Sequence, residues 1–144
     1  IWWACCALGA LGIGSALHED ITIFTKSGAG KDSLSIQIRD SIPSDPNAVI
    51  YIPYPVSKWW NNYFCPCGEI VFFAAEEEVK PWRERHGLPE GQIINISTAI
   101  EIANIWWPDS LSPTWRRKTS AEINSMFKKV GLQGDFWKVD ETFK

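Results

Sequence analysis

A buried strand that begins beside two cysteines is the feature that most constrains the fold of this chain. Cys65-Pro66-Cys67 stands just before the unbroken apolar run Ile70-Val71-Phe72-Phe73. A run without alternating polar residues predicts a strand, from Cys67 to Ala75, that is covered on both faces. The rest of the chain must therefore supply layers on both sides of this strand, and two thiols stand at its entrance.

The length and composition indicate one globular domain. The chain has 144 residues, of which 45% are hydrophobic, and it includes nine tryptophans. A chain of this size can bury a core without disulfide bonds. The net charge of −3 argues against a nucleic-acid-binding surface, and the one basic cluster, at 116–118, is too short to provide one.

The first seventeen residues carry no charge, which three kinds of segment could explain. A secretory signal would need a basic start, and a membrane span needs about 20 apolar residues without the Gly and Ser found here. A buried helix over Trp2–Leu17 fits best. Because the sequence starts at Ile1, we expect it to be the C-terminal part of a longer chain, with a domain over 1–131 and a peripheral tail over 132–144.

The remaining pattern mixes strands and helices without a regular βαβ alternation, which predicts the α+β class with mostly antiparallel strands. Leu34, Ile36 and Ile38 alternate with polar residues, as in a strand with one buried face. Ser97 or Thr98 is expected to cap a helix. We expect further strands at 20–26, 33–39, 48–52 and 92–96, and helices at 79–86, 99–107 and 120–130.

The second pair of thiols, Cys5-Cys6, lies near the start of the first predicted helix. A helix N-terminus lowers the pKa of a thiol, and thiolates select soft metals such as Cu(I), Hg(II) and Zn. If the fold joins the two pairs, a soft-metal or thiol-chemistry site results; otherwise the cysteines are small buried hydrophobic residues. His18 and His86 stand where solvated or C-capping histidines belong, so they are poor zinc ligands.

Three motifs resemble the alkylmercury (organomercurial) lyase family. They are Trp3-Ala4-Cys5-Cys6-Ala7-Leu8, then Phe64-Cys65-Pro66-Cys67 through Phe72-Phe73-Ala74, then Trp82-x-x-x-His86-Gly87-Leu88-x-x-Gly91. The resemblance covers roughly residues 1 to 107. It implies an α+β fold with two ββαβ-type repeats. In the family a winged-helix-like N-terminal domain precedes this catalytic part, and we expect the given sequence to start after it.

The resemblance also implies the chemistry. Two thiolates hold the mercury of the substrate while an acid protonates the carbon, which releases R–H and leaves Hg(II) on the cysteines. By position these thiolates are Cys6 and Cys67. The resemblance implies no cofactor and no membrane or nucleic-acid partner. It implies an organomercurial substrate, Hg(II)-accepting thiols or a mercuric reductase as partners, and a cytoplasmic role in bacterial mercury resistance and detoxification.

One departure from the family keeps alternatives open. The family acid lies three residues after the first cysteine, where this chain has Gly9. Cys5 and Cys65 are extra thiols, and Glu69, Asp20 or a water could donate the proton instead. A lyase is therefore the first hypothesis and a non-catalytic Hg, Cu or Zn binder the second. The third is a thiol redox or structural role, with Cys65–Cys67 or a cross-chain disulfide.

Overall fold

The computed structural model describes all of the chain except residues 29, 31, 61–65 and 141–144, and residues 66 and 67 by their backbone alone. Its helices are α1 (Ala7–Leu17), α2 (Val79–Arg85), α3 (Ile96–Trp106) and α4 (Ser120–Lys129). Its strands are β1 (Ile21–Lys26), β2 (Ser33–Arg39), β3 (Ile42–Pro43), β4 (Val49–Ile52), β5 (Val71–Phe73) and β6 (Gln92–Asn95).

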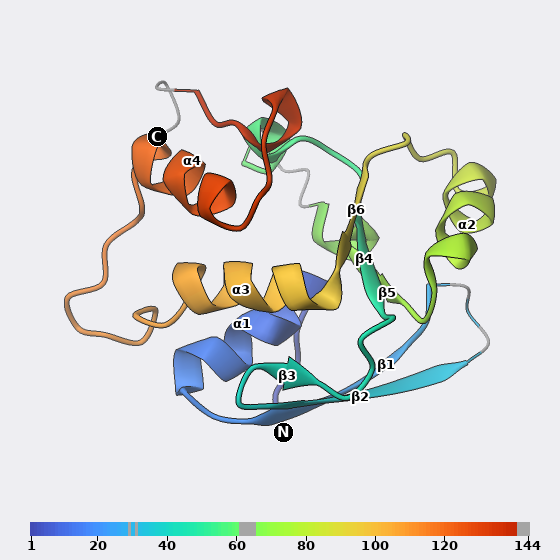
Figure 1. The fold of residues 1–144 in the computed structure, drawn as a ribbon, viewed down its shortest axis with the longest axis horizontal. Coiled ribbons are helices and arrows are strands. Elements are labelled where there is room, and N and C mark those ends of the chain that lie inside the picture. The colour runs from blue at the N-terminus through green and yellow to red at the C-terminus, as the bar shows by residue number, and fades with distance from the viewer. Residues whose placement is uncertain (29, 31, 61–65, 141–144) are drawn as a thin grey trace.

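The strands form two antiparallel sheets, which confirms the α+β class (Figure 1). One sheet has the order β1-β2-β3, and the predicted hairpin pairs Ile23 with Ile36. The other has the order β5-β4-β6, with Val49 of β4 opposite Phe73 on one side and Asn95 on the other. The short strand β3 lies in a segment that its two prolines predict as loop.

Strand β4 is buried along its whole length and separates two hydrophobic clusters. Ile50 and Ile52 face the main core with α1 and α3, whereas Val49 and Tyr51 face a smaller cluster beneath α2. Figure 1 shows α2 on the opposite side of this sheet from α1 and α3. Because side chains alternate along a strand, β4 contributes side chains to both hydrophobic clusters.

The predicted burial of the next strand on both faces is confirmed, but its length is not. Phe72 faces the main core and Phe73 the smaller cluster. The strand, however, spans only Val71–Phe73, and Cys67 lies in a 3-10 turn, η2, over Pro66–Glu69. Proline lacks the N–H that a ladder needs and glycine weakens strands, which explains why the turn replaces the strand there.

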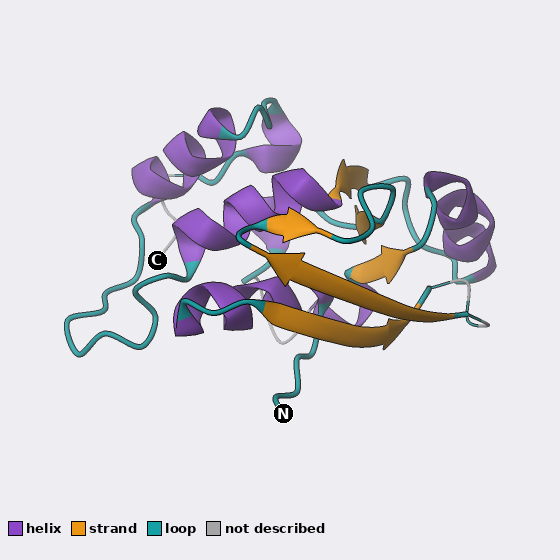
Figure 2. Ribbon diagram, turned by 60° about the horizontal axis from the view of Figure 1, so that its bottom comes forward, coloured by secondary structure: helices purple, strands orange, loops and turns teal. Residues whose placement is uncertain are grey.

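Helix α1 begins at Ala7, later than the sequence predicts. Trp2 and Trp3 are exposed and lie outside the helix, because Cys6 has an extended backbone and occupies the N-cap. The helix packs beside α3 (Figures 1 and 2), where the Ser15 hydroxyl donates to the Ala103 carbonyl at 2.8 Å. The N-cap of α3 is Asn95 and not Ser97 or Thr98, so the helix begins at Ile96, and the Asn95 side chain accepts a hydrogen bond from the Thr98 N–H.

The C-terminal segment is part of the core, so the expected peripheral tail is wrong for residues 135–140. Trp137 and Val139 are buried, and the Trp137 ring lies 5.2 Å from that of Phe127 on α4. Asn124 holds the segment through two hydrogen bonds with the backbone of Val139. Trp137 thus adds apolar surface to the core, which the mostly polar composition of this segment does not predict.

No helix among the described residues is both long enough and apolar enough to cross a lipid bilayer.

Gly12 is where α1 meets the ring of Trp107, which leads to a stability prediction. A Cβ at position 12 would lie 2.7 Å from the nearest atom of that ring. We expect Gly12→Ala to lower the free energy of unfolding by about 1–3 kcal/mol, because the crowded ring must shift. Gly9→Ala is the matched control: its nearest described neighbour would be at 3.4 Å, so the gain in helix propensity should dominate. Urea denaturation of both variants checks the opposite signs.

Glu122 completes the capping box of α4 with Thr119, and its carboxylate pairs with Arg116 at 2.6 Å. The hydrogen bond from Arg116, with those from Thr119, lowers the pKa of Glu122 from 4.5 to about 2. A lowered pKa means that this contribution to stability is present above pH 4.5 and is lost as the pH falls toward 2.

We therefore predict that Glu122→Gln has a lower urea midpoint than the wild type near neutral pH, and that the difference disappears by about pH 2. Glutamine can still complete a capping box, so the comparison isolates the charge. Glu101→Gln, at an exposed position on α3, is the control. A constant difference across this pH range would contradict the prediction.

Candidate functional site

The thiol of Cys6 is held at the N-terminus of α1. Its Sγ accepts a hydrogen bond from the backbone N–H of Gly9 at 3.2 Å, and the side chain is half-buried against the main core. The backbone of Cys6 is extended, as at most N-caps, which turns the sulfur back toward the first turn. An N–H donor and the helix dipole both favour the thiolate, the form that binds metals.

The adjacent thiol, Cys5, has a different environment. It is an exposed free thiol, whereas Cys6 packs against the core. The two adjacent thiols therefore differ in their exposure to solvent and in their contacts with the core.

A backbone hydrogen bond joins the start of α1 to the segment that carries the second candidate thiol. The Ala7 N–H donates to the Ile70 carbonyl at 3.0 Å. Cys6 is one residue before Ala7, and Cys67 is three residues before Ile70. The fold thus brings these two segments together. Cys65 and the side chain of Cys67 lie outside the described residues, so the approach of the two sulfurs stays a prediction.

A side chain at position 9 would point toward the Cys6 thiol. A Cβ built there would lie 3.4 Å from Cys6 Sγ, its nearest neighbour among the described residues. This is an ordinary contact distance, so a side chain could be accommodated beside the sulfur. Residues three positions apart on a helix lie on the same face, so the sequence predicted that Cys6 and Gly9 would be neighbours. The structure agrees with this prediction.

The described interactions of Glu69 are with two tyrosines. Burial, and then the charge and hydrogen bonding of Glu69, raise the pKa of Tyr54. Burial, with a smaller contribution from Glu69, raises the pKa of Tyr51 to about 12. Tyr51 lies on the α2 face of β4, across the sheet from α1. One carboxyl oxygen of Glu69 is buried and has no hydrogen-bond partner among the described residues.

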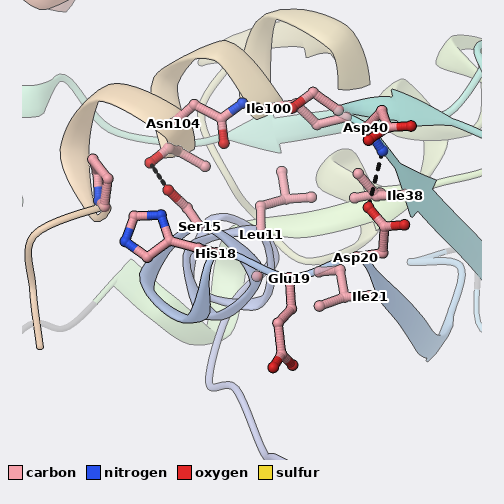
Figure 3. Close-up of a pocket in the computed structure, with 14 residues that line it drawn as sticks. Leu11, Ser15, His18, Glu19, Asp20, Ile21, Ile38, Asp40, Ile100 and Asn104 are labelled. Carbon is pink, nitrogen blue, oxygen red and sulfur yellow. Dashed lines mark hydrogen bonds between the residues drawn. The ribbon is translucent and has the colours of Figure 1, made fainter.

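Asp20 lies at the far end of α1 and lines a cavity of about 390 Å³ (Figure 3). Its Oδ1 accepts a hydrogen bond from the backbone N–H of Asp40 at 2.9 Å. Helix α1 has eleven residues and is about 16 Å long, so this end is remote from Cys6. Asp20 is therefore not placed to donate a proton at the thiol site.

The cavity, which the sequence did not reveal, is lined by Leu11, Gly14, Ser15, His18, Glu19, Asp20, Ile21, Ile38, Asp40, Ser41, Ile100, Ala103, Asn104 and Pro108.

Both histidines are exposed, as predicted. His18 is the left-handed C-cap of α1. His86 ends α2, where its ring stacks on Trp82 at 4.4 Å and its Nδ1 lies 2.7 Å from the Trp82 carbonyl. Over the part of the chain that the structure describes, no group of three His, Cys, Asp or Glu side chains could hold a metal ion.

Four tryptophans form a continuous stack beside α1. The rings of Trp106 and Trp107 lie 5.6 Å apart at 22°, and Trp106 also stacks on Trp59 and Trp60. Trp107 covers Gly12, and Trp60 has the guanidinium of Arg117 at 5.9 Å from its ring centre. The sequence suggests core and rim packing for these pairs, and in the structure Trp59, Trp106 and Trp107 are half-buried whereas Trp60 is exposed. The sequence does not predict that the four rings stack together.

The chain was compared with known families and structures. The family model MerB, alkylmercury lyase, matches residues 1–107. A search of curated proteins gives no match. Among solved structures, the chain is similar to the mercury-bound form of MerB2, with a TM-score of 0.57 and 22% identity. This likeness concerns the fold; it covers 71% of this chain and 50% of that one, so the chain spans half the length of MerB2. Because the family model matches well over half of the chain, the chain belongs to the alkylmercury lyase family.

Proposed function

We propose that this protein cleaves the carbon–mercury bond of organomercurials, giving R–H and Hg(II). The observation that carries the proposal is the Cys6 thiol, which accepts the Gly9 N–H at a helix N-terminus and lies beside the segment of Cys67, in a chain of this family. Residues 1–131 would form the catalytic part.

The chemistry follows from the properties of thiolates. The Cys6 thiolate displaces the weaker ligand of R–Hg–X, and the Cys67 thiolate adds to the same mercury. Electron donation from two sulfurs makes the carbon basic enough to accept a proton. The carbon–mercury bond then breaks, its electron pair forms the new C–H bond, and Hg(II) stays on the two sulfurs. Soft thiolates retain soft Hg(II) until external thiols, or those of a mercuric reductase, take it over.

The proton donor distinguishes this chain from the family pattern. Gly9 has no carboxylate, Asp20 is at the far end of α1, and the described contacts of Glu69 are with Tyr51 and Tyr54. Water then supplies the proton. General-acid help contributes about 10²–10⁴-fold in rate, so this protein should capture organomercurials better than it cleaves them.

The same observation supports a second candidate, a non-catalytic binder of Hg, Cu or Zn on this fold. Gly9 removes the acid, and Cys5 and Cys65 add thiols to the two that match the family. Such a protein would retain the metal compound without turnover.

The deciding experiment is single-turnover cleavage of phenylmercury, with benzene measured by gas chromatography and Hg(II) retention by native mass spectrometry. We expect slow benzene release by the wild type, and loss of release and of tight retention in Cys6→Ser and Cys67→Ser. Serine is a favoured N-cap residue, so Cys6→Ser should keep α1 intact.

Cys5→Ser, at the exposed neighbouring thiol, is the control and should behave as the wild type. Tight binding without benzene release would favour the non-catalytic binder. Unchanged binding in both site variants would reject Cys6 and Cys67.

A second prediction restores the acid. Gly9→Asp places a carboxyl group beside Cys6 Sγ, because a Cβ there lies 3.4 Å from the sulfur. With methylmercury, whose organic group is small, we expect the single-turnover rate to rise by roughly 10²–10⁴-fold. Gly9→Asn has nearly the same shape and no acid, so it should not show the increase. Fast cleavage by the wild type, lost in Glu69→Gln, would instead assign the donor role to Glu69.

A further inference from the structure

We propose that the cavity at the C-terminal end of α1 is a second binding site, which takes a small organic cation: a protonated amine that carries a compact apolar group. The rim of this cavity lies at the opposite end of α1 from the Cys6 thiol. Binding there needs no mercury chemistry, so the site goes beyond the proposed function.

The cavity has the size and the interior of a small-molecule site. Its volume of about 390 Å³ lies within the range of roughly 300–1,000 Å³ that is typical of ligand pockets. Leu11 of α1, Ile38 of β2, and Ile100 and Ala103 of α3 line it, and all four belong to the main core. An apolar group that enters the cavity therefore leaves water for the surface of the hydrophobic core.

Two reversals of the chain build the polar rim of the cavity. At the end of α1, His18 has a φ of 54°, and between β2 and β3, Asp40 and Ser41 have φ values of 48° and 64°. Asn104 of α3 donates to the Ser41 hydroxyl at 2.9 Å, which joins α3 to this rim. Figure 3 shows Asp20 and Asp40 on one side of the cavity and His18 on the other.

The rim carries negative charge without a basic partner. The hydrogen bond from the Asp40 N–H to Asp20 Oδ1 holds these two acidic residues side by side. Neither forms an ion pair within the described part of the chain, where no lysine or arginine lines the cavity. Arg39, next to Asp40, donates instead to the Ile21 carbonyl at 3.4 Å. Because like charges repel, a cation bound beside both aspartates is attracted to each of them.

This charge favours an organic cation over a metal ion. The described residues include no group of three His, Cys, Asp or Glu side chains that could hold a metal, and Figure 3 shows the Glu19 carboxyl group turned away from Asp20. An ammonium group donates hydrogen bonds to separate acceptors and does not need a closed ligand shell. One compact amine can therefore meet the acidic rim with its charge and the interior with its apolar group.

Benzylammonium is the probe, and its binding to the ¹⁵N-labelled protein is followed by two-dimensional NMR. We expect saturable shifts at the residues that line the cavity. Two analogues separate the contributions, since benzyl alcohol lacks the charge and methylammonium lacks the ring. Benzyl alcohol should bind roughly threefold to tenfold more weakly, and methylammonium at least about tenfold more weakly. This comparison uses the wild type alone.

Asp20→Asn and Asp40→Asn remove the charges and keep the local structure. Asparagine at position 20 can still accept the Asp40 N–H, and asparagine tolerates the left-handed backbone at position 40. Each variant should weaken benzylammonium binding by about threefold and leave that of benzyl alcohol unchanged. Asp32→Asn, at the other end of the β1–β2 hairpin, is the matched control and should change neither. Circular dichroism establishes that the variants are folded.

Cys6→Ser separates this site from the thiol and should bind benzylammonium as the wild type does. Saturable binding at the cavity that both aspartate variants weaken, with Asp32→Asn unchanged, would support the site. Equal binding of benzylammonium and benzyl alcohol, no saturable shifts at the cavity, or shifts around Cys6 that Cys6→Ser abolishes would overturn it. The lyase proposal is tested with mercury compounds, so none of these results decides it.

Discussion

The fold depends on one strand that is buried on both faces. β4 pairs with β5 and β6 and sends alternate side chains into two separate clusters. Ile50 and Ile52 support the layer of α1 and α3, while Val49 and Tyr51 support α2. Because every residue of β4 is buried, neither layer could be removed without exposing half of its side chains. The position of α1, and with it Cys6, follows from this arrangement.

Two hydrogen bonds from backbone N–H groups hold the N-terminus of α1 in place. Ala7 donates to Ile70, and the Gly9 N–H donates to the Cys6 sulfur. One unsatisfied donor of the first turn is thus used to hold a thiol, where most helices use a hydroxyl or carboxylate. Structure and proposed chemistry coincide here, since the group that caps the helix is also the group expected to hold mercury.

Two of the three glycines on α1, Gly9 and Gly12, have different surroundings, although each lowers the intrinsic stability of the helix. Gly12 is required by Trp107, whose ring occupies the place of a side chain, whereas the Cys6 sulfur is the one neighbour within 4 Å of a Cβ at Gly9 among the described residues. Glycine at position 9 leaves the first turn of α1 without an acidic side chain. The choice between the two proposed functions, a slow lyase and a non-catalytic binder, depends on which group then donates the proton.

The sequence by itself determined the α+β class, the β1–β2 hairpin, the buried Phe72-Phe73 pair and the family, because apolar periodicity and motif spacing are local properties. It also predicted that Gly9 and Cys6 share a face, since helical spacing fixes this. The tertiary structure decided what depends on contacts distant in the chain. These features are the hydrogen bond between Ala7 and Ile70, the burial of Trp137, the position of Cys6 as the N-cap of α1, and the stack of four tryptophans. Packing against distant residues decides such features, and a sequence pattern does not show which distant surfaces meet.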